Sequence, residues 1–128
     1  MRFIDEIKFP ISSFKAGTKV ILRDGREFYI NKIEMLFGNS YFTAIGKSEN
    51  SLFPLSWVTE IRENETLDFF EKDTVVFVKE SELLWQVIVS DKICTLMKRI
   101  DTEEILPFET TNLIRYFRNG LIELRFLS

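Results

Sequence analysis

The sequence predicts an all-β protein of two tandem small β-barrels followed by a C-terminal β-hairpin. Apolar and polar residues alternate along most of the chain, turn signals interrupt the alternation about every eight to twelve residues, and no stretch keeps a helical period over three turns. A proline motif also recurs, because Phe53-Pro54-Leu55 is mirrored by Leu106-Pro107-Phe108, 53 residues further on. A repeat of this length predicts two similar units.

The first unit begins with a strand over Thr18–Arg23, which ends at Asp24-Gly25. This pair tolerates positive φ angles and therefore predicts a tight hairpin. The return strand starts at Glu27, and its apolar positions slip by one residue near Asn31-Lys32. The slip predicts a bulge or sharp bend, which lets one long strand serve both sheets of a small barrel.

After the slip, the regular apolar positions of this long strand are Ile33, Met35 and Phe37. Gly38-Asn39 then predicts a turn into a strand over residues 41–45, and a polar loop over residues 46–50 leads into the first proline motif. Each of these steps follows the plan of a small antiparallel meander.

The second unit repeats this plan, with strands over Asp73–Val78, Leu83–Val89 and Lys92–Lys98. Ile61-Arg62, which follows the first proline motif, is matched by Ile114-Arg115 after the second. Strict alternation places Trp85 on the same face as Leu83, Val87 and Val89, so Trp85 is expected in the core. Cys94, in the middle of its strand, is expected to be a small buried residue.

The boundary between the units falls in the polar segment Glu63–Thr66, which divides the chain into domains 1–63 and 64–128. Asn119-Gly120 lies between the apolar segments Leu113–Phe117 and Leu121–Phe126 and predicts the closing hairpin. Phenylalanine occurs 13 times, more than two small interiors need. Some of these rings are therefore expected to face the other barrel or a partner: Phe37, Phe42, Phe69, Phe70, Phe117 and Phe126.

Two segments carry a family resemblance. Residues 51–61 read Ser-Leu-Phe-Pro-Leu-Ser-Trp-Val-Thr-Glu-Ile, which looks like the C-terminal stretch of Src-homology-3 domains, Gly-Leu-hydrophobic-Pro-Ser-Asn-Tyr-Val followed by an isoleucine strand. Residues 14–18 are similar to the Phe-Lys-x-Gly-Asp strand entry of that family, and Leu67–Asp73 resembles the same entry. The resemblance covers residues 12–62 and 67–116 and implies two tandem Src-homology-3-like five-stranded barrels.

The same resemblance implies where a ligand would bind. By the family pattern Pro54 and Trp57 would lie in the groove of the first unit, and Pro107 and Trp85 in that of the second, where Thr110 replaces the groove tyrosine. The N-terminal tyrosine-rich segment and the long acidic loop of the family are missing, so half of its aromatic groove for polyproline peptides is absent. We therefore expect a prokaryotic or viral relative that binds a different ligand.

Composition argues against catalysis. The chain has no histidine and one cysteine, which removes the commonest general base and the usual zinc ligands, and its five glycines form no phosphate loop. We expect no enzyme activity, no cofactor and no metal. The net charge of -3 and the pI near 5.1 argue against generic nucleic-acid binding. The acids Asp5 and Glu6 do not suit a signal peptide, and no run of about 18 apolar residues exists, so we expect a cytoplasmic protein without a membrane span.

These observations together predict a non-catalytic protein–protein interaction module, monomeric or homodimeric, such as a small phage or mobile-element adaptor or inhibitor that occupies a host protein. Two alternatives stay open. One is a structural subunit that oligomerises through the edges of the closing hairpin. The other is an RNA- or DNA-associated barrel of the Tudor or ribosomal-protein kind, in which Arg115 and Arg125 would be cross-strand neighbours. Its basic residues would be Lys98, Arg99, Arg115, Arg118 and Arg125.

Overall fold

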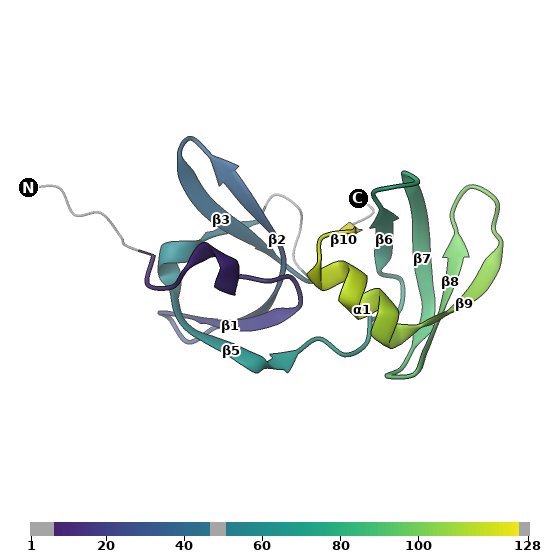
Figure 1. Cartoon of the computed structure of the whole chain (residues 1–128), viewed down its shortest axis with the longest axis horizontal. Coiled ribbons are helices and arrows are strands. Elements are labelled where there is room, and N and C mark those ends of the chain that lie inside the picture. The colour runs from purple at the N-terminus through teal and green to yellow at the C-terminus, as the bar shows by residue number, and fades with distance from the viewer. Residues whose placement is uncertain (1–6, 47–50, 126–128) are drawn as a thin grey trace, which may run out of the picture. The chain divides into compact units, whose positions relative to one another are not determined.

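The computed structural model describes residues 7–46 and 51–125, and the chain divides into two compact units, Met1–Thr66 (unit 1) and Leu67–Ser128 (unit 2) (Figure 1). Each unit contains its own five-stranded antiparallel sheet, which confirms the prediction of a mostly β protein. No helix within the described ranges is long and apolar enough to cross a membrane.

Unit 1 has the strand order β4-β3-β2-β1-β5. Its elements are η1 (Ile11–Ser13), β1 (Thr18–Leu22), β2 (Glu27–Leu36), β3 (Asn39–Ala44), β4 (Leu52–Pro54), η2 (Leu55–Trp57) and β5 (Val58–Thr66). The outermost strands β4 and β5 are not hydrogen-bonded to each other within the described residues, so the sheet is not closed into the expected barrel. The short 3-10 turn η2 joins these two edges and covers one end of the core.

Two local predictions for unit 1 are confirmed. Gly25 adopts a φ of 89° in a tight turn, and its N–H donates to the carbonyl of Leu22 at 2.9 Å. The bulge occurs where the pairing between β2 and β3 shifts register between Ile30 and Lys32. Ile30 and Asn31 are consecutive and both buried, because the bulge turns two neighbouring residues toward the interior.

Met35 and Phe37, which continue the apolar alternation after the slip, do not reach the core of unit 1. β1 pairs with β2 only at residues 27–29, and β4 pairs with β3 only at residues 41–43. Beyond these positions the β2–β3 hairpin has no third strand beside it and projects from the rest of unit 1 (Figure 1). Alternation cannot bury a side chain where no layer covers the hairpin, so Met35 is 65% exposed and Phe37 is fully exposed.

The sequence indicated that the polar segment Glu63–Thr66 links the two units. In the structure this segment is the last part of β5. Thr66 lies opposite Thr18, and the Lys19 ammonium lies 3.3 Å from the Glu65 carboxylate. Charged residues can occupy a strand when oppositely charged residues face them across the pair.

The core of unit 1 is a single apolar cluster. Its buried members come from the strands, from η2 and from the segment after η1: Phe14, Val20, Leu22, Ile30, Phe42, Ala44, Leu55 and Val58.

Unit 2 repeats this topology, with the strand order β9-β8-β7-β6-β10 and no hydrogen bonding between its described edges β9 and β10. Its elements are β6 (Val75–Val78), β7 (Leu83–Ser90), β8 (Cys94–Arg99), β9 (Ile105–Glu109), α1 (Thr110–Arg118) and β10 (Ile122–Arg125). Helix α1 stands between the fourth and fifth strands, at the position that η2 occupies in unit 1.

The predicted closing hairpin is wrong. The first apolar segment lies in α1, where Thr110, Leu113 and Phe117 are buried at spacings of three and four residues. Gly120 ends the helix with a φ of 77° and donates its N–H to the carbonyl of Phe117, so Asn119-Gly120 is a helix stop. The second segment supplies β10, the fifth strand, although Phe126 lies outside the described residues.

This helix also explains why the internal repeat ends after its proline motif. Pro54 and Pro107 lie in equivalent edge strands, β4 and β9. Ile114-Arg115 belongs to α1, however, whereas Ile61-Arg62 belongs to β5. In unit 2 the strand equivalent to β5 is β10, further along the chain.

Two burial predictions in unit 2 are wrong, one in β7 and one in β8. Pairing between β7 and β8 shifts between Val87 and Val89, so a bulge changes the phase of β7. Trp85 and Val87 are buried as expected, but Val89 is 53% exposed. Cys94 is exposed as well, since it lies on the outer face of β8, opposite Glu109.

The interior of unit 2 combines apolar packing with a chain of hydroxyl groups. Thr95 Oγ1 lies 2.7 Å from both Ser90 Oγ and Thr110 Oγ1, which links β7, β8 and the first residue of α1. The apolar core residues are Phe70, Val75, Val76, Trp85, Val87, Met97, Leu113, Phe117, Ile122 and Leu124.

Of the six phenylalanines expected to face the other barrel or a partner, three are buried, namely Phe42 in unit 1 and Phe70 and Phe117 in unit 2. Phe37 and Phe69 are exposed. The buried rings show that each small core accommodates more aromatic volume than its length suggests.

Candidate functional site

A hollow with a volume of about 320 Å³ opens on the surface of unit 1. Tyr41 of β3 and Pro54 of β4 lie directly opposite each other in the sheet, and both line the hollow. Ser56 of η2 lies on one side. The remaining lining residues are Ile7, Gly38, Asn39 and Ser40. An aromatic ring beside a proline, with hydroxyl groups near both, suits an extended polypeptide better than a charged metabolite.

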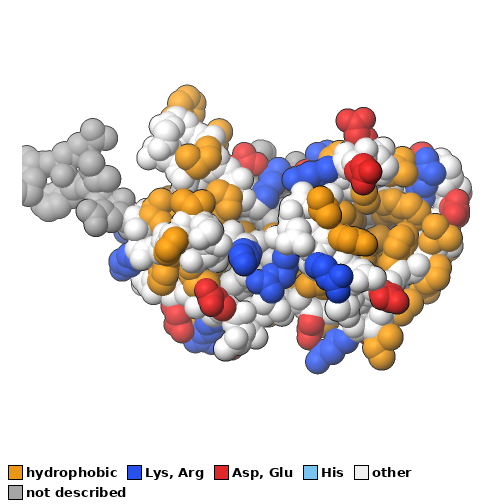
Figure 2. Space-filling view, in the orientation of Figure 1, with side chains coloured by type: hydrophobic (Ala, Val, Ile, Leu, Met, Phe, Trp, Pro, Cys, Tyr) orange, Lys and Arg blue, Asp and Glu red, His pale blue; other side chains and the backbone are white. Residues whose placement is uncertain are grey.

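The tip of the β2–β3 hairpin borders this hollow, because Gly38 and Asn39 belong to both. Met35, Leu36 and Phe37 are three consecutive exposed apolar residues at the tip, and Figure 2 shows apolar side chains at the end of this arm. The Ser40 hydroxyl lies 2.9 Å from the Met35 sulfur, across the hairpin. The tip is thus a compact apolar projection beside a concave surface.

Phe37 also has an unusual backbone conformation. Phe37 and Gly38 form the two-residue turn, with φ angles of 51° and 79°. Both central residues of such a turn need positive φ, for which asparagine, aspartate and glycine are strongly preferred. A bulky residue in this region costs about 1–3 kcal/mol. Neither burial nor backbone preference accounts for a phenylalanine here.

Trp57, the second groove residue expected in unit 1, is half-buried and packs against the core cluster from η2. The Arg23 guanidinium lies over its ring, 4.8 Å from the centroid. The exposed part of the indole is therefore already in contact with a cation, which fits the capping role that the sequence left open beside an interaction role.

The two groove residues expected in unit 2 do not meet. Trp85 is buried on the inner face of β7, where its ring contacts Phe108 edge-on at 5.3 Å between centroids. Pro107 lies opposite Leu96 on the outer face and is exposed. Because opposite faces of a sheet cannot form one groove, the expectation of a shared groove is wrong, as is the placement of Thr110 there, since Thr110 is buried in the core.

The five basic residues of the nucleic-acid alternative do not converge as that alternative expected. Arg115 and Arg118 lie on α1 and Arg125 lies in β10, so Arg115 and Arg125 are not cross-strand neighbours. Arg125 pairs with Glu123 at 2.9 Å and stacks over a phenylalanine ring. In β8, Arg99 pairs with Asp101 at 2.6 Å, whereas Lys98 lies beside it on the opposite face. A positive field needs cations that are free and gathered, and two of the five are neutralised within unit 2.

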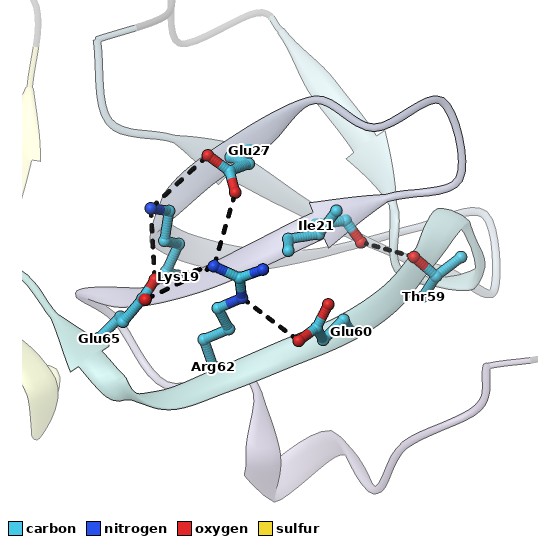
Figure 3. Close-up of polar contacts among 7 residues, drawn as sticks. All are labelled: Lys19, Ile21, Glu27, Thr59, Glu60, Arg62 and Glu65. Atoms are coloured by element: carbon cyan, nitrogen blue, oxygen red, sulfur yellow. Dashed lines mark hydrogen bonds and ion pairs between the residues drawn. The ribbon is translucent and has the colours of Figure 1, made fainter.

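Unit 1 also has a cluster of charged side chains whose positive and negative charges pair with one another (Figure 3). Three carboxylates, from Glu27, Glu60 and Glu65, surround the cations of Lys19 and Arg62. The hydrogen bond with Glu65 raises the pKa of Lys19, and the same contact lowers the pKa of Glu65. Since the opposite charges satisfy one another across β1, β2 and β5, this cluster stabilises the sheet and offers little to an ionic ligand.

The sequence identified Pro54 and included Phe37 among the rings expected to face the other barrel or a partner, but it missed Tyr41 and did not place Phe37 at a turn. One signal was present, because a two-residue turn placed at Phe37-Gly38, rather than at Gly38-Asn39, puts the phenylalanine at the exposed tip. Comparisons with protein-family models, with curated proteins and with solved structures found no match to the chain. Within residues 7–46 and 51–125, no group of three acidic or cysteine side chains is placed to hold a metal ion.

Proposed function

We propose that this chain is a non-catalytic protein-binding module, and that unit 1 anchors a partner protein through Phe37 and the adjoining hollow. The observation that carries this proposal is a fully exposed phenylalanine held at a positive φ angle. Strained backbone and exposed aromatic side chains are both unfavourable for the free protein, and both recur at binding sites. Aromatic anchors contribute a large share of the energy in protein interfaces.

The hollow gives this anchor a neighbouring surface. Phe37 would enter an apolar pocket of the partner, while Tyr41 and Pro54 would receive a chain segment of the partner. Pro54 is the residue that the resemblance to Src-homology-3 domains places in a ligand groove, and in both units a helical turn or helix follows the proline strand. We propose on this basis that the units are two Src-homology-3-like folds, and that the chain acts as a small phage or mobile-element adaptor or inhibitor of a host protein.

The test is the Phe37→Asn variant, used to capture partners from an extract of the native cells. Asparagine accepts positive φ, so the variant should be more stable than the wild-type chain by about 1 kcal/mol in denaturant titration. Capture of the partner, quantified by mass spectrometry, should fall by about 30-fold, the effect of losing an anchor worth about 2 kcal/mol. A gain in stability with a loss of binding separates function from folding.

A matched control is Ile93→Asn, which replaces an 81% exposed apolar residue of unit 2. This variant should retain the proteins that the wild-type chain captures. Tyr41→Ala should reduce capture without changing the hairpin turn. Equal recovery with wild-type and Phe37→Asn protein would refute the proposal.

A further inference from the structure

The chain contains one Asn-Gly pair, Asn119-Gly120, which follows helix α1 and is exposed on the surface of unit 2. Asparagine before glycine is especially prone to deamidation, because glycine has no Cβ that hinders attack of its own nitrogen on the preceding side chain. In this chain the conformation of the pair is set by the way in which α1 ends. Whether the reaction proceeds therefore depends on the last turn of the helix.

Deamidation replaces the side-chain amide by a carboxylate. A base removes the proton from the Gly120 nitrogen, which bonds to Asn119 Cγ and closes a cyclic imide. The Cγ–Nδ2 bond breaks, and ammonia leaves with a proton from water. A water molecule then opens the imide at either of its carbonyl groups and leaves aspartate or isoaspartate in place of asparagine. Because the solvent supplies both water and base, the reaction needs no other reactant.

The folded backbone opposes closure of the imide. Closure needs the Asn119 Cβ and the Gly120 nitrogen nearly eclipsed about the Cα–C bond of Asn119. At the observed ψ of 3° the backbone nitrogen of Asn119 takes the eclipsed position instead, so Cβ lies about 120° away from it. The Gly120 N–H also donates to the carbonyl of Phe117 at 3.1 Å, so the attacking nitrogen is tied to the helix.

A second hydrogen bond holds the same conformation. The Leu121 N–H donates to the carbonyl of Tyr116 at 2.9 Å. Together with the Gly120 bond and the φ of 77° at Gly120, it ends the helix in a Schellman motif. Rotation of the Asn119 ψ angle to the reactive value moves both N–H groups away from their acceptors. The imide can therefore form only after the last turn of α1 has opened.

Unit 1 contains a chemically related pair, Asp24-Gly25, which is protected more strongly. The Gly25 N–H donates to the carbonyl of Leu22, and the Asp24 carboxylate accepts bonds from the Arg26 backbone N–H at 3.0 Å and from Arg26 Nε at 2.7 Å. The backbone hydrogen bond first, and then the side chain of Arg26, lower the pKa of Asp24 and keep it ionised. An ionised carboxylate is a poor electrophile, whereas the Asn119 amide is neutral.

We propose that Asn119 is a deamidation site controlled by the C-terminus of α1, protected in the folded chain and reactive whenever the last helical turn opens. This property is separate from partner binding by unit 1. The product hinders reclosure, because its carboxylate lies at the C-terminal end of a helix, where the peptide dipoles disfavour negative charge. Isoaspartate also adds a methylene group to the backbone. Each modified molecule thus keeps a covalent record that unit 2 has opened.

The test compares deamidation with amide hydrogen exchange in the full-length chain at one pH and temperature. Peptide mapping by mass spectrometry measures conversion of Asn119, both in buffer and in denaturant that unfolds the chain. Folding should slow deamidation by the same factor as exchange of the Gly120 amide, within about threefold, because one opening admits both reactions. Asn119→Gln keeps the backbone that ends the helix but needs a larger ring, so this control should stay unmodified over the same period.

Two core variants test whether α1 is the controlling element. Phe117→Ala removes the buried ring that holds the last turn against the core of unit 2, and should raise the rate in buffer about tenfold or more, up to the rate of the wild-type chain in denaturant if unit 2 unfolds. Leu55→Ala empties the core of unit 1 instead and should leave the rate unchanged.

Three results would overturn the proposal. The first is a folded chain that deamidates as fast as the denatured chain. The second is a Gly120 amide that exchanges freely while Asn119 stays unmodified. The third is an equal change of the rate in Phe117→Ala and Leu55→Ala.

Discussion

The two units share one strand order and differ in what joins the fourth strand to the fifth. In unit 1 this connection is η2, three residues long, and in unit 2 it is α1, nine residues long. Helix α1 adds Leu113 and Phe117 to the core, whereas η2 adds Leu55. The connection between the fourth and fifth strands can thus add one or several side chains to the core without changing the strand order. In both units the two edge strands remain unpaired with each other.

The units also leave different surfaces uncovered. Unit 1 extends a long hairpin arm, whose apolar tip has no layer over it. Within residues 67–125, unit 2 has no such arm, and its sheet instead exposes Val89 of β7 and Pro107 of β9 on its outer face. The same strand order therefore leaves exposed apolar side chains at the tip of a hairpin in unit 1 and on the face of the sheet in unit 2.

The largest expected effect comes from substitutions in the segment that joins the fourth strand to the fifth, which is α1 in unit 2 and η2 in unit 1. Phe117→Ala empties the centre of unit 2, where the ring is fully buried and contacts Phe70 edge-on, and should cost about 3–5 kcal/mol. Leu55→Ala, the counterpart in η2, should cost about 2–5 kcal/mol in unit 1. Amide hydrogen exchange, followed residue by residue, measures both effects in the intact chain.

Protection of the β6–β8 amides should fall in Phe117→Ala, and protection of the β1–β3 amides should fall in Leu55→Ala. Ile11→Ala, at an exposed position of unit 1, is the control and should change neither set. If Phe117→Ala left the β7 amides as protected as before, α1 would not be the element that completes the core of unit 2.

A smaller effect comes from one buried threonine in each sheet. Thr95 Oγ1 lies at hydrogen-bond distance from two hydroxyl groups, so Thr95→Val, which keeps the shape, should destabilise unit 2 by about 1–3 kcal/mol. Thr43 Oγ1 is buried with no hydrogen-bond partner among the described residues. Thr43→Val should therefore be neutral or should stabilise unit 1 by up to about 1 kcal/mol.

Denaturant unfolding of the two variants, followed by circular dichroism, measures whether the free energy of unfolding falls in Thr95→Val and stays the same or rises in Thr43→Val. Equal destabilisation by both substitutions would mean that the hydroxyl chain of unit 2 contributes nothing beyond shape.

The confirmed local predictions depend on short stretches of sequence, either a residue's own backbone preference or the phase of apolar alternation. Asp24-Gly25 produced its turn, and the slipped phase at Asn31 produced its bulge. Gly120 of the Asn119-Gly120 pair also adopts the positive φ that the pair suggested, but a positive φ ends a helix as readily as it turns a hairpin. Only the 3.6-residue spacing of Thr110, Leu113 and Phe117 distinguishes the two, and it spans little more than two turns.

The candidate site was harder to predict because the exposure of a side chain depends on which other strands lie beside it, and these strands come from distant parts of the sequence. Pro54 could be found from its motif, since proline is excluded from the middle of a sheet. Whether Phe37 is buried depends on whether β1 and β4 extend beside it, and their lengths are decided elsewhere in the chain. Val89 was misplaced because one extra residue in β7 reverses the face of the residues that follow it in that strand.

The smallest expected effect concerns the charges across the β1–β5 pair of unit 1. The hydrogen bond from Lys19 lowers the pKa of Glu65 below its ordinary value of 4.5. A carboxylate whose pKa is depressed by folding stabilises the folded state above its ordinary pKa, and this contribution is lost as the pH falls through the folded-state value. Glu65→Gln should therefore slightly lower the melting temperature at pH 7 and change it less at pH values well below 4.5, where the wild-type carboxylate is protonated.

Asp91 in the turn after β7 of unit 2 provides a comparison, because its pKa is lowered by hydrogen bonds from the backbone N–H groups of Cys94 and Ile93. Backbone donors stay charge-neutral and in place at any salt concentration, whereas the Lys19 ammonium is screened by salt. In 0.5 M NaCl the effect of Glu65→Gln at pH 7 should shrink, and that of Asp91→Ala should persist. Thermal melts of the two variants at low and high salt measure this difference, and an equal response to salt would show that the Lys19–Glu65 pair adds nothing to the strand pairing in which it lies.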